Sequence, residues 1–411
     1  MQGLIYSAFT AFLGFEVNEG EYKLMGMAPY GQPRYADKVA RLADLKGDGS
    51  FRLDMSYFSY HYHLERSFHR RFEELFGAPR DPKARFVMRQ TSLYDDPTPP
   101  TEEELDRNQF YADIAASIQQ VTEDVLLRMA HHLHRTTGCP YLCMAGGVAL
   151  NSVANYKILR QTPFEEVYIQ PAAGDAGGAL GAALYAYHVL LGKPRAFTLE
   201  HAYWGEEYGP AAIAQAVRAR AFPWEEIADD EALLERVVDA LMQGRVVGWY
   251  QGRLEWGPRA LGNRSILADA RLERMKDVVN IKIKFREPFR PFAPSVIEEA
   301  AEDYFDIPDV KRHYPARLML YVAPVKSGKV PAITHVDGTG RVQTVQRGWN
   351  PRYARLLEKF GEATGVPLLL NTSFNLKGEP MVTTPENALD TFARSGMDVL
   401  VLQNVLVTKR T

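Results

Sequence analysis

Cysteine is nearly absent from this sequence of 411 residues, which contains only Cys139 and Cys143. Two cysteines cannot build the disulfide framework of a small secreted protein. A single C-x3-C pair without further cysteines or a nearby histidine is also a poor metal signature. We therefore expect both thiols to be free and buried.

Long apolar runs are missing as well. No stretch reaches the roughly 20 apolar residues that a membrane-spanning helix needs. No charged segment followed by an apolar one opens the sequence, as it would in a signal peptide. These absences predict a cytoplasmic protein that does not use a membrane.

A strong charge of one sign is the third feature that the sequence lacks. It has 48 basic and 51 acidic residues, for a net charge of -3, which argues against a surface that binds nucleic acid. Any anion site must therefore be local. The hydrophobic content of 46% and charged content of 24% are those of an ordinary globular protein. The length predicts two domains, because it exceeds what one hydrophobic core usually serves.

Apolar periodicity in the first half predicts an α/β arrangement. Apolar residues recur at helical spacing from Gln109 to His134, and Gly138 is a plausible end of this helix. Further on, the expected elements are a strand at 141–145, a helix at 149–160, a strand at 167–170 and a helix ending near residue 191. Strands that run into glycine turns and then helices are typical of α/β units with loops gathered at the strand ends.

The second half contains its own set of elements. Residues 194–228 lack clear periodicity and carry Pro, Gly and aromatics, so they predict a linker. A second unit starts near Asp229. Its expected elements are helices to Met242, around Met275 and after Thr384-Pro385, and strands at 245–250, 264–267, 318–322, 367–370 and 399–407.

Two glycine turns in the first half are candidate ligand sites. Gly146 and Gly147 follow a strand and precede a helix, where backbone amides can approach a nucleotide, although a plain tight turn explains them equally well. Asp175 lies between glycines at the end of the next strand. Its carboxylate could face a metal ion or a ribose, or could cap the following helix.

The most distinctive feature is a basic region in the second half. Between Arg253 and Arg290 the sequence has ten basic and five acidic residues, in a chain that is acidic overall. The basic residues alternate with Gly, Pro and Phe, which is more typical of a shaped pocket than of a helix face. Arginine forks and lysine ammonium groups bind phosphoryl oxygens, so we interpret this region as a phosphate pocket. A salt-bridged surface or a nucleic-acid patch are the alternatives.

Two polar clusters could contribute to the same pocket. The stretch Leu370–Asn375 places Asn, Thr and Ser at the end of a strand, where they can both donate and accept hydrogen bonds to a carbamoyl amide. A simple Asx-type turn is the alternative. The stretch Thr334–Gln343 could bring Arg341 to the pocket.

Six ordered segments resemble the carbamoyltransferase family that includes nodulation-factor, cephalosporin and tobramycin-type O-carbamoyltransferases. The segments are Lys23–Gly31, Gly146–Asn151, Gly257–Ser265, Phe285–Pro294, His335–Gly338 and Asn371–Asn375. They extend over nearly the whole chain, which makes a chance similarity improbable.

The resemblance implies a fold and a reaction. It implies an α/β protein with part of an actin-like ATPase-fold domain at 1–198, a linker at 199–228 and a domain resembling a threonylcarbamoyl-adenylate synthase at 229–411. The second domain would make carbamoyl-adenylate from carbamoyl phosphate and ATP. The first would transfer the carbamoyl group to a hydroxyl of a small-molecule acceptor.

The resemblance also implies roles for individual residues. The implied catalytic residues are Arg259, Lys284, Arg286 and Arg290. The residues implied to bind carbamoyl phosphate and ATP are Arg264, Ser265, Arg341, Asn371, Ser373 and Asn375. Nucleotide binding in the transfer domain would use Gly146, Gly147, Asn151, Gly177 and Gly178. Asp175 would bind a divalent metal, Fe or Mg. The histidine ligands that the family pairs with it are absent from this chain.

This departure predicts either a fragment or a partner chain that supplies the missing N-terminal half. The residues leave the acceptor and the oligomeric state open. A tRNA threonylcarbamoyl-modifying enzyme is a second hypothesis, which the net acidic charge disfavours. A third is a nucleotide-binding remnant without transfer activity.

Overall fold

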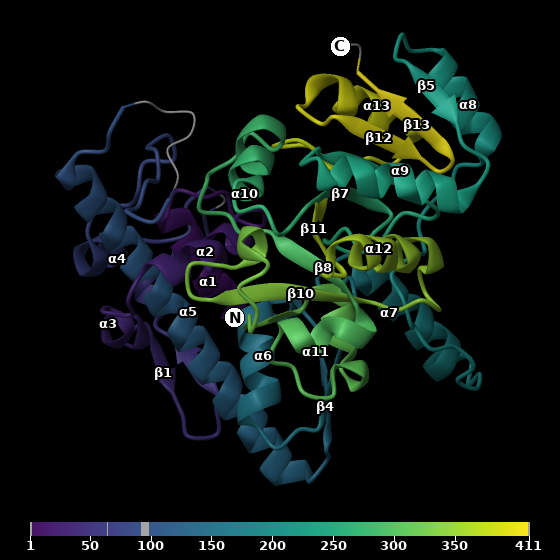
Figure 1. Cartoon of the computed structure of the whole chain (residues 1–411). Helices are drawn as coiled ribbons and strands as arrows, with labels where there is room; N and C mark the ends of the chain where they lie inside the picture. The colour runs from purple at the N-terminus through teal and green to yellow at the C-terminus, as the bar shows by residue number, and fades with distance from the viewer. Residues whose placement is uncertain (1, 64, 92–97, 410–411) are drawn as a thin grey trace. The chain divides into compact units, whose positions relative to one another are not determined.

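The computed structural model describes residues 2–63, 65–91 and 98–409 (Figure 1). The chain forms two compact units. Unit 1 contains Met1–Cys143, Gly147–Val167 and Glu287–Arg290. Unit 2 contains Met144–Gly146, Tyr168–Arg286 and Pro291–Thr411.

Unit 1 is mainly helical. Its elements are α1 (Gln2–Phe12), α2 (Glu21–Met27), α3 (Ala36–Ala40), α4 (Arg70–Phe76), α5 (Glu102–Thr137), α6 (Ser152–Gln161) and the hairpin of β1 (Ala43–Leu45) with β2 (Phe51–Leu53). Phe9, Phe12 and Phe72 are fully buried and pack ring against ring in its core. The predicted helix of residues 109–134 is confirmed as part of α5, and Gly138 ends it in the left-handed conformation.

The stretch Glu21–Gly31 forms α2 and a 3-10 turn, because Leu24 and Met27 are spaced to bury one helix face. One expectation for unit 1 is wrong, since the thiols of Cys139 and Cys143 are exposed and not buried. In β3 (Tyr141–Met144) it is Leu142 that turns inward, so strand alternation turns Cys143 outward.

Unit 2 is built on a mixed sheet of nine strands in the order β5-β13-β12-β6-β7-β11-β8-β10-β9. The strands are β5 (Trp224–Glu226), β6 (Val247–Tyr250), β7 (Arg264–Ala268), β8 (Ala293–Ile297), β9 (Tyr321–Pro324), β10 (Thr339–Val345), β11 (Leu368–Ser373), β12 (Val399–Leu402) and β13 (Val405–Thr408). The pairs β12 with β6 and β10 with β8 are parallel, and the other pairs are antiparallel. A separate two-stranded sheet pairs β3 with β4 (Glu166–Ile169).

Helices cover both faces of the nine-stranded sheet. On one face, α9 (Asp230–Met242) and α12 (Pro351–Thr364) lie next to each other and bury Trp249 and Leu369 of the strands beneath them (Figure 1). On the other face, α13 (Pro385–Arg394) packs over β6 and β12 and contacts α8 (Pro210–Arg218). Thr384 caps α13 as predicted.

Two segments of unit 2 contain more structure than the sequence indicated. The segment expected to be a linker includes α8 and the edge strand β5. The run 399–407 is a hairpin rather than one strand, because Gln403 adopts a φ of 50° and reverses the chain between β12 and β13. Within the described part of the chain, no helix combines the length and apolar character that crossing a bilayer requires.

Candidate functional site

One end of the nine-stranded sheet gathers the polar side chains that the sequence singled out. The register sets Ser373, at the end of β11, opposite Ser265, near the start of β7. It also sets Asn371 opposite Ala293, the first residue of β8. The parallel neighbour β10 begins at the same end, because its Gln343 pairs with Ser295 of β8. The loops that precede β7 and β8 and the first residues of β10 therefore lie at the same end of the sheet.

Lys284 is fixed at the end of β11. Its side chain is buried, and its Nζ donates to the carbonyl oxygens of Ser373 at 2.6 Å and Asn375 at 2.9 Å. The Asn375 Oδ1 and the Ser373 Oγ lie 2.5 Å and 3.2 Å from the same Nζ. A lysine held by this many oxygens presents its charge at one defined place. The next residue, Phe285, has a φ of 47°, a strained conformation for a bulky side chain that turns the chain sharply before Arg286.

Two arginines of unit 2, Arg259 and Arg286, lie close enough to a third, Arg341, to repel its charge. Burial lowers the pKa of Arg341 well below its ordinary value, and the charges of Arg259 and Arg286 lower it further. The Arg341 Nε is inaccessible to solvent and makes no hydrogen bond. Arg286 is oriented by Asn280, whose Oδ1 accepts from its Nε at 2.7 Å, and by the ring of Phe292 beneath its guanidinium. We call Arg259, Arg286 and Arg341 the cationic cluster.

The side-chain amide of Asn371 donates several hydrogen bonds, but its oxygen accepts none. Its Nδ2 donates to the carbonyl oxygen of Ala260 at 3.2 Å, to the Ser295 Oγ at 2.9 Å and to the Gln343 Oε1 at 2.9 Å. Its Oδ1 is buried and accepts no hydrogen bond. Gln343 in turn donates to the carbonyl oxygen of Leu261 at 2.8 Å. The amide of Asn371 is therefore locked in orientation with an oxygen available for an N–H group.

The loop that carries Arg259 is held by a residue that the sequence did not single out. The Glu255 Oε1 accepts from the backbone N–H groups of Leu261 at 2.7 Å, Asn263 at 2.8 Å and Arg264 at 3.2 Å. Glu255 is buried. Its signal in the sequence is that it is the single acidic residue in the basic stretch from Arg253 to Ser265.

Replacing Glu255 with alanine should lower the free energy of unfolding by about 2 kcal/mol, because three buried N–H groups lose their acceptor. Chemical denaturation of the variant would measure the loss. Glu207, an exposed acidic residue in the same unit, provides the matched control, and its alanine variant should match the parent protein. Equal stability of the two variants would contradict a structural role for the Glu255 carboxylate.

His335 is held neutral beside the cationic cluster. Burial lowers its pKa to about 4, and the charges of Arg341 and Lys276 lower it as well, against the opposing effect of Asp337. Its Nδ1 lies 3.1 Å from the Thr339 Oγ1, which donates to the Asp337 Oδ1 at 2.7 Å. A neutral imidazole at this position adds no further positive charge to the crowded end of the sheet.

This pKa predicts how stability depends on pH. The unfolded chain protonates His335 near its ordinary pKa of about 6.5, whereas the folded chain does so only near 4. The unfolded state therefore binds more protons between these values, and the free energy of unfolding falls as pH falls through this window, by up to about 3 kcal/mol from this group. Denaturation at a series of pH values should show a flatter dependence for His335→Gln. Parallel curves for the two proteins would exclude the effect.

Other predicted residues of the pocket have different surroundings. Arg264 is fully buried, with its guanidinium 3.6 Å from the ring centre of Tyr250, and its Nη1 donates to the carbonyl oxygens of Gln251 at 2.6 Å and Asn263 at 3.0 Å. Ser265 is also fully buried, and its Oγ accepts from Gly262 N–H at 3.1 Å. Both residues support the loop from within.

Arg290 belongs to unit 1. Its guanidinium forms an ion pair with Glu287 at 2.5 Å and donates to the Tyr22 hydroxyl at 3.2 Å. The structure thus places Lys284 and the cationic cluster in one unit and Arg290 in the other.

The residues predicted for the transfer site are also divided between the units. Asn151, in unit 1, caps α6 and exchanges hydrogen bonds with Gln119, whereas Gly147 begins a 3-10 turn in the same unit. Gly146 belongs to unit 2, where its N–H donates to the carbonyl oxygen of Ala173 at 2.8 Å.

The turn Gly174–Gly178, also in unit 2, contains Asp175, Gly177 and Gly178. A Cβ at Gly177 would lie 2.3 Å from the backbone carbonyl oxygen of Ala172, so this position requires glycine. Gly178 has open space around it.

The metal predicted at Asp175 has too few ligands among the residues that the structure describes. Asp175 is exposed and offers one carboxylate. Among residues 2–63, 65–91 and 98–409, no group of three or more His, Cys, Asp and Glu side chains is arranged to hold a metal ion. The residues present therefore do not complete such a site.

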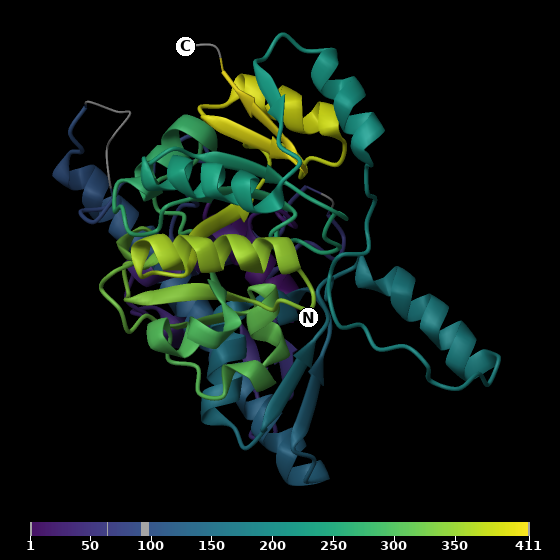
Figure 2. The same cartoon turned by 45° about the vertical axis from the view of Figure 1, so that its right-hand side comes forward.

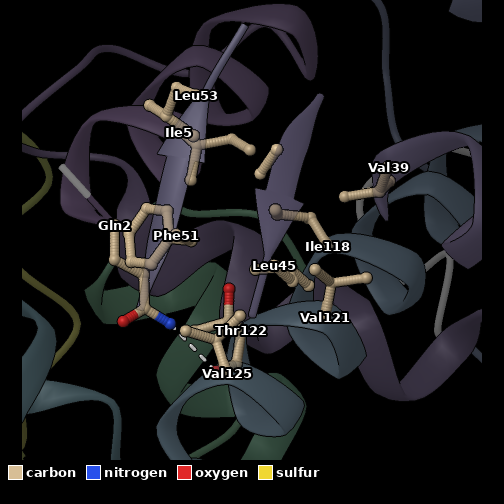
Figure 3. A pocket seen from close by; sticks show the side chains of 11 residues that line it. Gln2, Ile5, Val39, Leu45, Phe51, Leu53, Ile118, Val121, Thr122 and Val125 are labelled. Carbon is tan, nitrogen blue, oxygen red and sulfur yellow. Dashed lines mark hydrogen bonds between the residues drawn. The ribbon is translucent and has the colours of Figure 1, made fainter. Parts of the chain in front are cut away.

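The hollow shown in Figure 3 lies in unit 1 and has a different character. Its volume is about 20 Å³, which is room for little more than one water molecule. It is lined mainly by aliphatic side chains such as Ile5, Val39 and Val121, and Gln2 closes it with a hydrogen bond to the carbonyl oxygen of Thr122 (Figure 3). It lacks the charged groups that chemistry on an anion needs.

Comparison with known proteins gives matches over most of the chain. A family model described as "Carbamoyltransferase N-terminus" matches residues 1–184, and one described as "Carbamoyltransferase C-terminus" matches residues 238–409.

Three curated relatives illustrate the similarity. An uncharacterised protein of Synechocystis sp. is 44% identical over 99% of this chain and 67% of its own length. Nodulation protein NolO of Bradyrhizobium diazoefficiens is 38% identical over 99% of this chain and 69% of its own. The 3'-hydroxymethylcephem-O-carbamoyltransferase of Streptomyces clavuligerus is 37% identical over 59% of this chain and 43% of its own length. The chain thus spans 43 to 69% of the length of these relatives.

Proposed function

The chain belongs to the carbamoyltransferase family, and from this premise we propose that unit 2 binds carbamoyl phosphate and ATP and forms carbamoyl-adenylate. The carbamoyl group would then pass to a hydroxyl of a small-molecule acceptor. The single observation that carries the proposal is the place of Arg341 on β10, with its Nε inaccessible to solvent and the charges of Arg259 and Arg286 near enough to lower its pKa. Like charges held together in a folded protein favour an anion between them.

The charge of the cluster suits a phosphoryl donor. Carbamoyl phosphate and the triphosphate of ATP carry several negative charges, and planar guanidinium groups bind phosphoryl oxygens with two hydrogen bonds each. Binding the anion would remove the repulsion that lowers the pKa of Arg341. Lys284, fixed by the oxygens of Ser373 and Asn375, would add a compact charge next to the oxygen on which negative charge develops.

The amide end of the donor needs a different partner. A carbamoyl group presents an NH₂, and the Asn371 Oδ1 is an acceptor held in a fixed direction with no hydrogen bond of its own. An N–H of the carbamoyl group would satisfy it. A buried acceptor that stays unpaired without its ligand discriminates against donors that lack the N–H group.

The chemistry needs two steps for its atoms to balance. Water attacks the carbamoyl carbon or the phosphorus of carbamoyl phosphate, which gives carbamate and inorganic phosphate. A carbamate oxygen then attacks the α-phosphorus of ATP, and pyrophosphate leaves. The arginines stabilise the negative charge on both leaving groups, and enclosure limits loss of carbamate to solvent. One phosphate and one pyrophosphate therefore form for each carbamoyl-adenylate.

Transfer to the acceptor is the second part of the proposal. Unit 1 would contribute to an actin-like transfer domain, with Asn151 among its polar groups. The acceptor hydroxyl must be placed next to the carbonyl carbon of the adenylate, and AMP leaves as the hydroxyl oxygen bonds to that carbon. A metal held in part by Asp175 remains a proposal, and no step here depends on it.

The test is to incubate the full chain with ATP and carbamoyl phosphate and to measure phosphate, pyrophosphate and AMP-linked product. We expect phosphate and pyrophosphate in equal amounts, and neither pyrophosphate nor AMP-linked product without carbamoyl phosphate. Binding of both ligands measured by calorimetry, with no pyrophosphate formed, would favour a nucleotide-binding remnant. Absence of binding would overturn the assignment of the site.

A further inference from the structure

Phe285 is an exposed aromatic side chain next to the cations of the candidate site. The sequence KFREPFRPF, which begins at Lys284, contains three phenylalanines. Phe289 and Phe292 are 1% and 2% exposed, which is usual for phenylalanine, whereas Phe285 is 51% exposed. It lies between Lys284 and Arg286 in the sequence. Among residues 2–63, 65–91 and 98–409, no other ring and no cation stacks on its side chain.

The backbone at Phe285 is strained, and the residues on both sides keep it so. Its φ of 47° lies in the left-handed region, which is unfavourable for a bulky side chain. The π-helical turn η5 (Val279–Ile283) ends at Lys284, whose Nζ is bound to oxygens at the end of β11. The Arg286 backbone N–H donates to the carbonyl oxygen of Asn280 at 3.1 Å, and its Nε donates to the Asn280 Oδ1 at 2.7 Å. The exposed ring is therefore presented at one defined place, and strain that neighbours maintain in this way is typical of ligand sites.

The proposed ligands include one group that the charged residues of the site do not match. The cationic cluster and Lys284 suit phosphoryl oxygens, and the Asn371 Oδ1 suits the N–H of a carbamoyl group. The adenine of ATP is flat and uncharged, and guanidinium and ammonium groups alone do not distinguish ATP from other polyphosphates. Nucleobases stack on exposed aromatic side chains, because every base has a π-face.

We propose that the ring of Phe285 stacks on the adenine of ATP while the neighbouring cations hold the phosphates. Phe285 is then the residue that selects a nucleotide over a polyphosphate without a base. This inference rests on the function proposed above and adds the recognition of the base to it. It also gives a reason for the strained backbone, since the same turn that directs Lys284 and Arg286 to the phosphates leaves the ring between them free for the base.

The experiment compares Phe285→Asn with the parent protein, both as the full chain. Asparagine removes the ring but tolerates a positive φ, so the variant should unfold at the same denaturant concentration as the parent protein or at a higher one. Its Kd for ATP, measured by calorimetry, should rise about tenfold or more, the usual cost of losing one base stack. Its Kd for carbamoyl phosphate and for inorganic tripolyphosphate should not change, because neither ligand has a ring. Phe285→Tyr keeps the ring and should bind ATP like the parent protein.

A tryptophan at the same position reports the contact directly. The emission that Phe285→Trp adds to that of the parent protein should be quenched by ATP and not by tripolyphosphate. Trp224 provides the matched control, because it is an exposed aromatic residue of the same unit on the edge strand β5. Figure 2 shows β5, in teal, next to the yellow β12–β13 hairpin. Three strands separate β5 from β7, a distance of about 20 Å between the two strands, so Trp224→Ala should leave ATP binding unchanged.

The possible results separate this inference from the function on which it rests. A Phe285→Asn variant that binds ATP as tightly as the parent protein would overturn stacking by the ring. Equal losses of affinity for ATP and tripolyphosphate would also overturn it, and would assign the effect to a displaced loop around Lys284 and Arg286. Both results leave the proposed function intact. A parent protein that binds neither ATP nor carbamoyl phosphate would overturn that function and this inference together.

Discussion

Replacing Arg341 with alanine should lower the rate of carbamoyl-adenylate formation by about 10² to 10³-fold, the usual cost of removing one charged donor from a preorganised anion site. Arg341 lies on β10 with its Nε inaccessible and unbonded, next to Arg259 and Arg286. The loss should appear in kcat/KM for carbamoyl phosphate, measured by pyrophosphate release. Arg341→Lys should recover only part of the rate, because an ammonium group lacks the planar fork of a guanidinium.

Stability separates this role from a structural one. Because its neighbours repel Arg341 and burial disfavours its charge, the alanine variant should unfold at the same denaturant concentration as the parent protein or at a higher one. Arg220 is the matched control, since it makes an exposed ion pair with Asp390 in the same unit. Arg220→Ala should change neither property. An Arg341→Ala variant that is unstable but fully active would contradict the proposed site.

Replacing Gly262 with alanine should lower the free energy of unfolding by about 3 kcal/mol or more. Gly262 has a φ of 108°, and a Cβ there would lie 2.2 Å from the Cδ1 of the fully buried Tyr353. Backbone strain and overpacking each cost about 1–3 kcal/mol. Denaturation by urea would measure the change. The loop that presents Arg259 should be displaced at the same time, so that adenylate formation falls as well.

A second substitution distinguishes the two causes of this loss. Tyr353→Leu shortens the aromatic side chain that a Cβ at position 262 would meet. Adding Gly262→Ala to Tyr353→Leu should therefore lower the free energy of unfolding by less than Gly262→Ala does in the parent protein, and the remaining loss is the part due to the positive φ. Gly328 has open space where a Cβ would be placed, and Gly328→Ala should change stability by less than about 0.5 kcal/mol. If the variants at 262 and 328 are equally stable, the close approach to Tyr353 is not a constraint.

The sequence predicted the elements whose signals are local. Helical periodicity identified most of α5, Gly138 identified its end, and Thr384-Pro385 identified the start of α13. The hairpin at 399–408 was missed, because the two residues between its strands are Gln403 and Asn404 and not the glycine-containing pair that usually marks such a turn. The exposure of Cys143 was missed because burial depends on which element covers a strand.

For the candidate site, the types of residue in the sequence indicated which side chains to consider, but they did not indicate what each side chain contacts. The surplus of basic residues pointed to Arg259 and Arg286, and the polar stretch at 334–343 pointed to Arg341. The charges of the first two lie near the third. Arg264 belongs to the same basic stretch as Arg259 and has the same chemistry, but its guanidinium is occupied by backbone carbonyl oxygens of its own loop. Glu255 was missed for the converse reason, since a carboxylate that binds three backbone N–H groups has no periodic signature.

The guanidinium of Arg264 has an electrostatic consequence beyond its structural one. An arginine side chain stays protonated at any pH at which the protein is folded, and this one is sealed from solvent at the start of β7. Mobile ions screen a sealed charge far less than a charge in contact with water. If unit 2 binds the proposed polyanionic ligands, the charge of Arg264 would add a permanent part to their attraction, which should persist at ionic strengths that abolish binding to surface lysines.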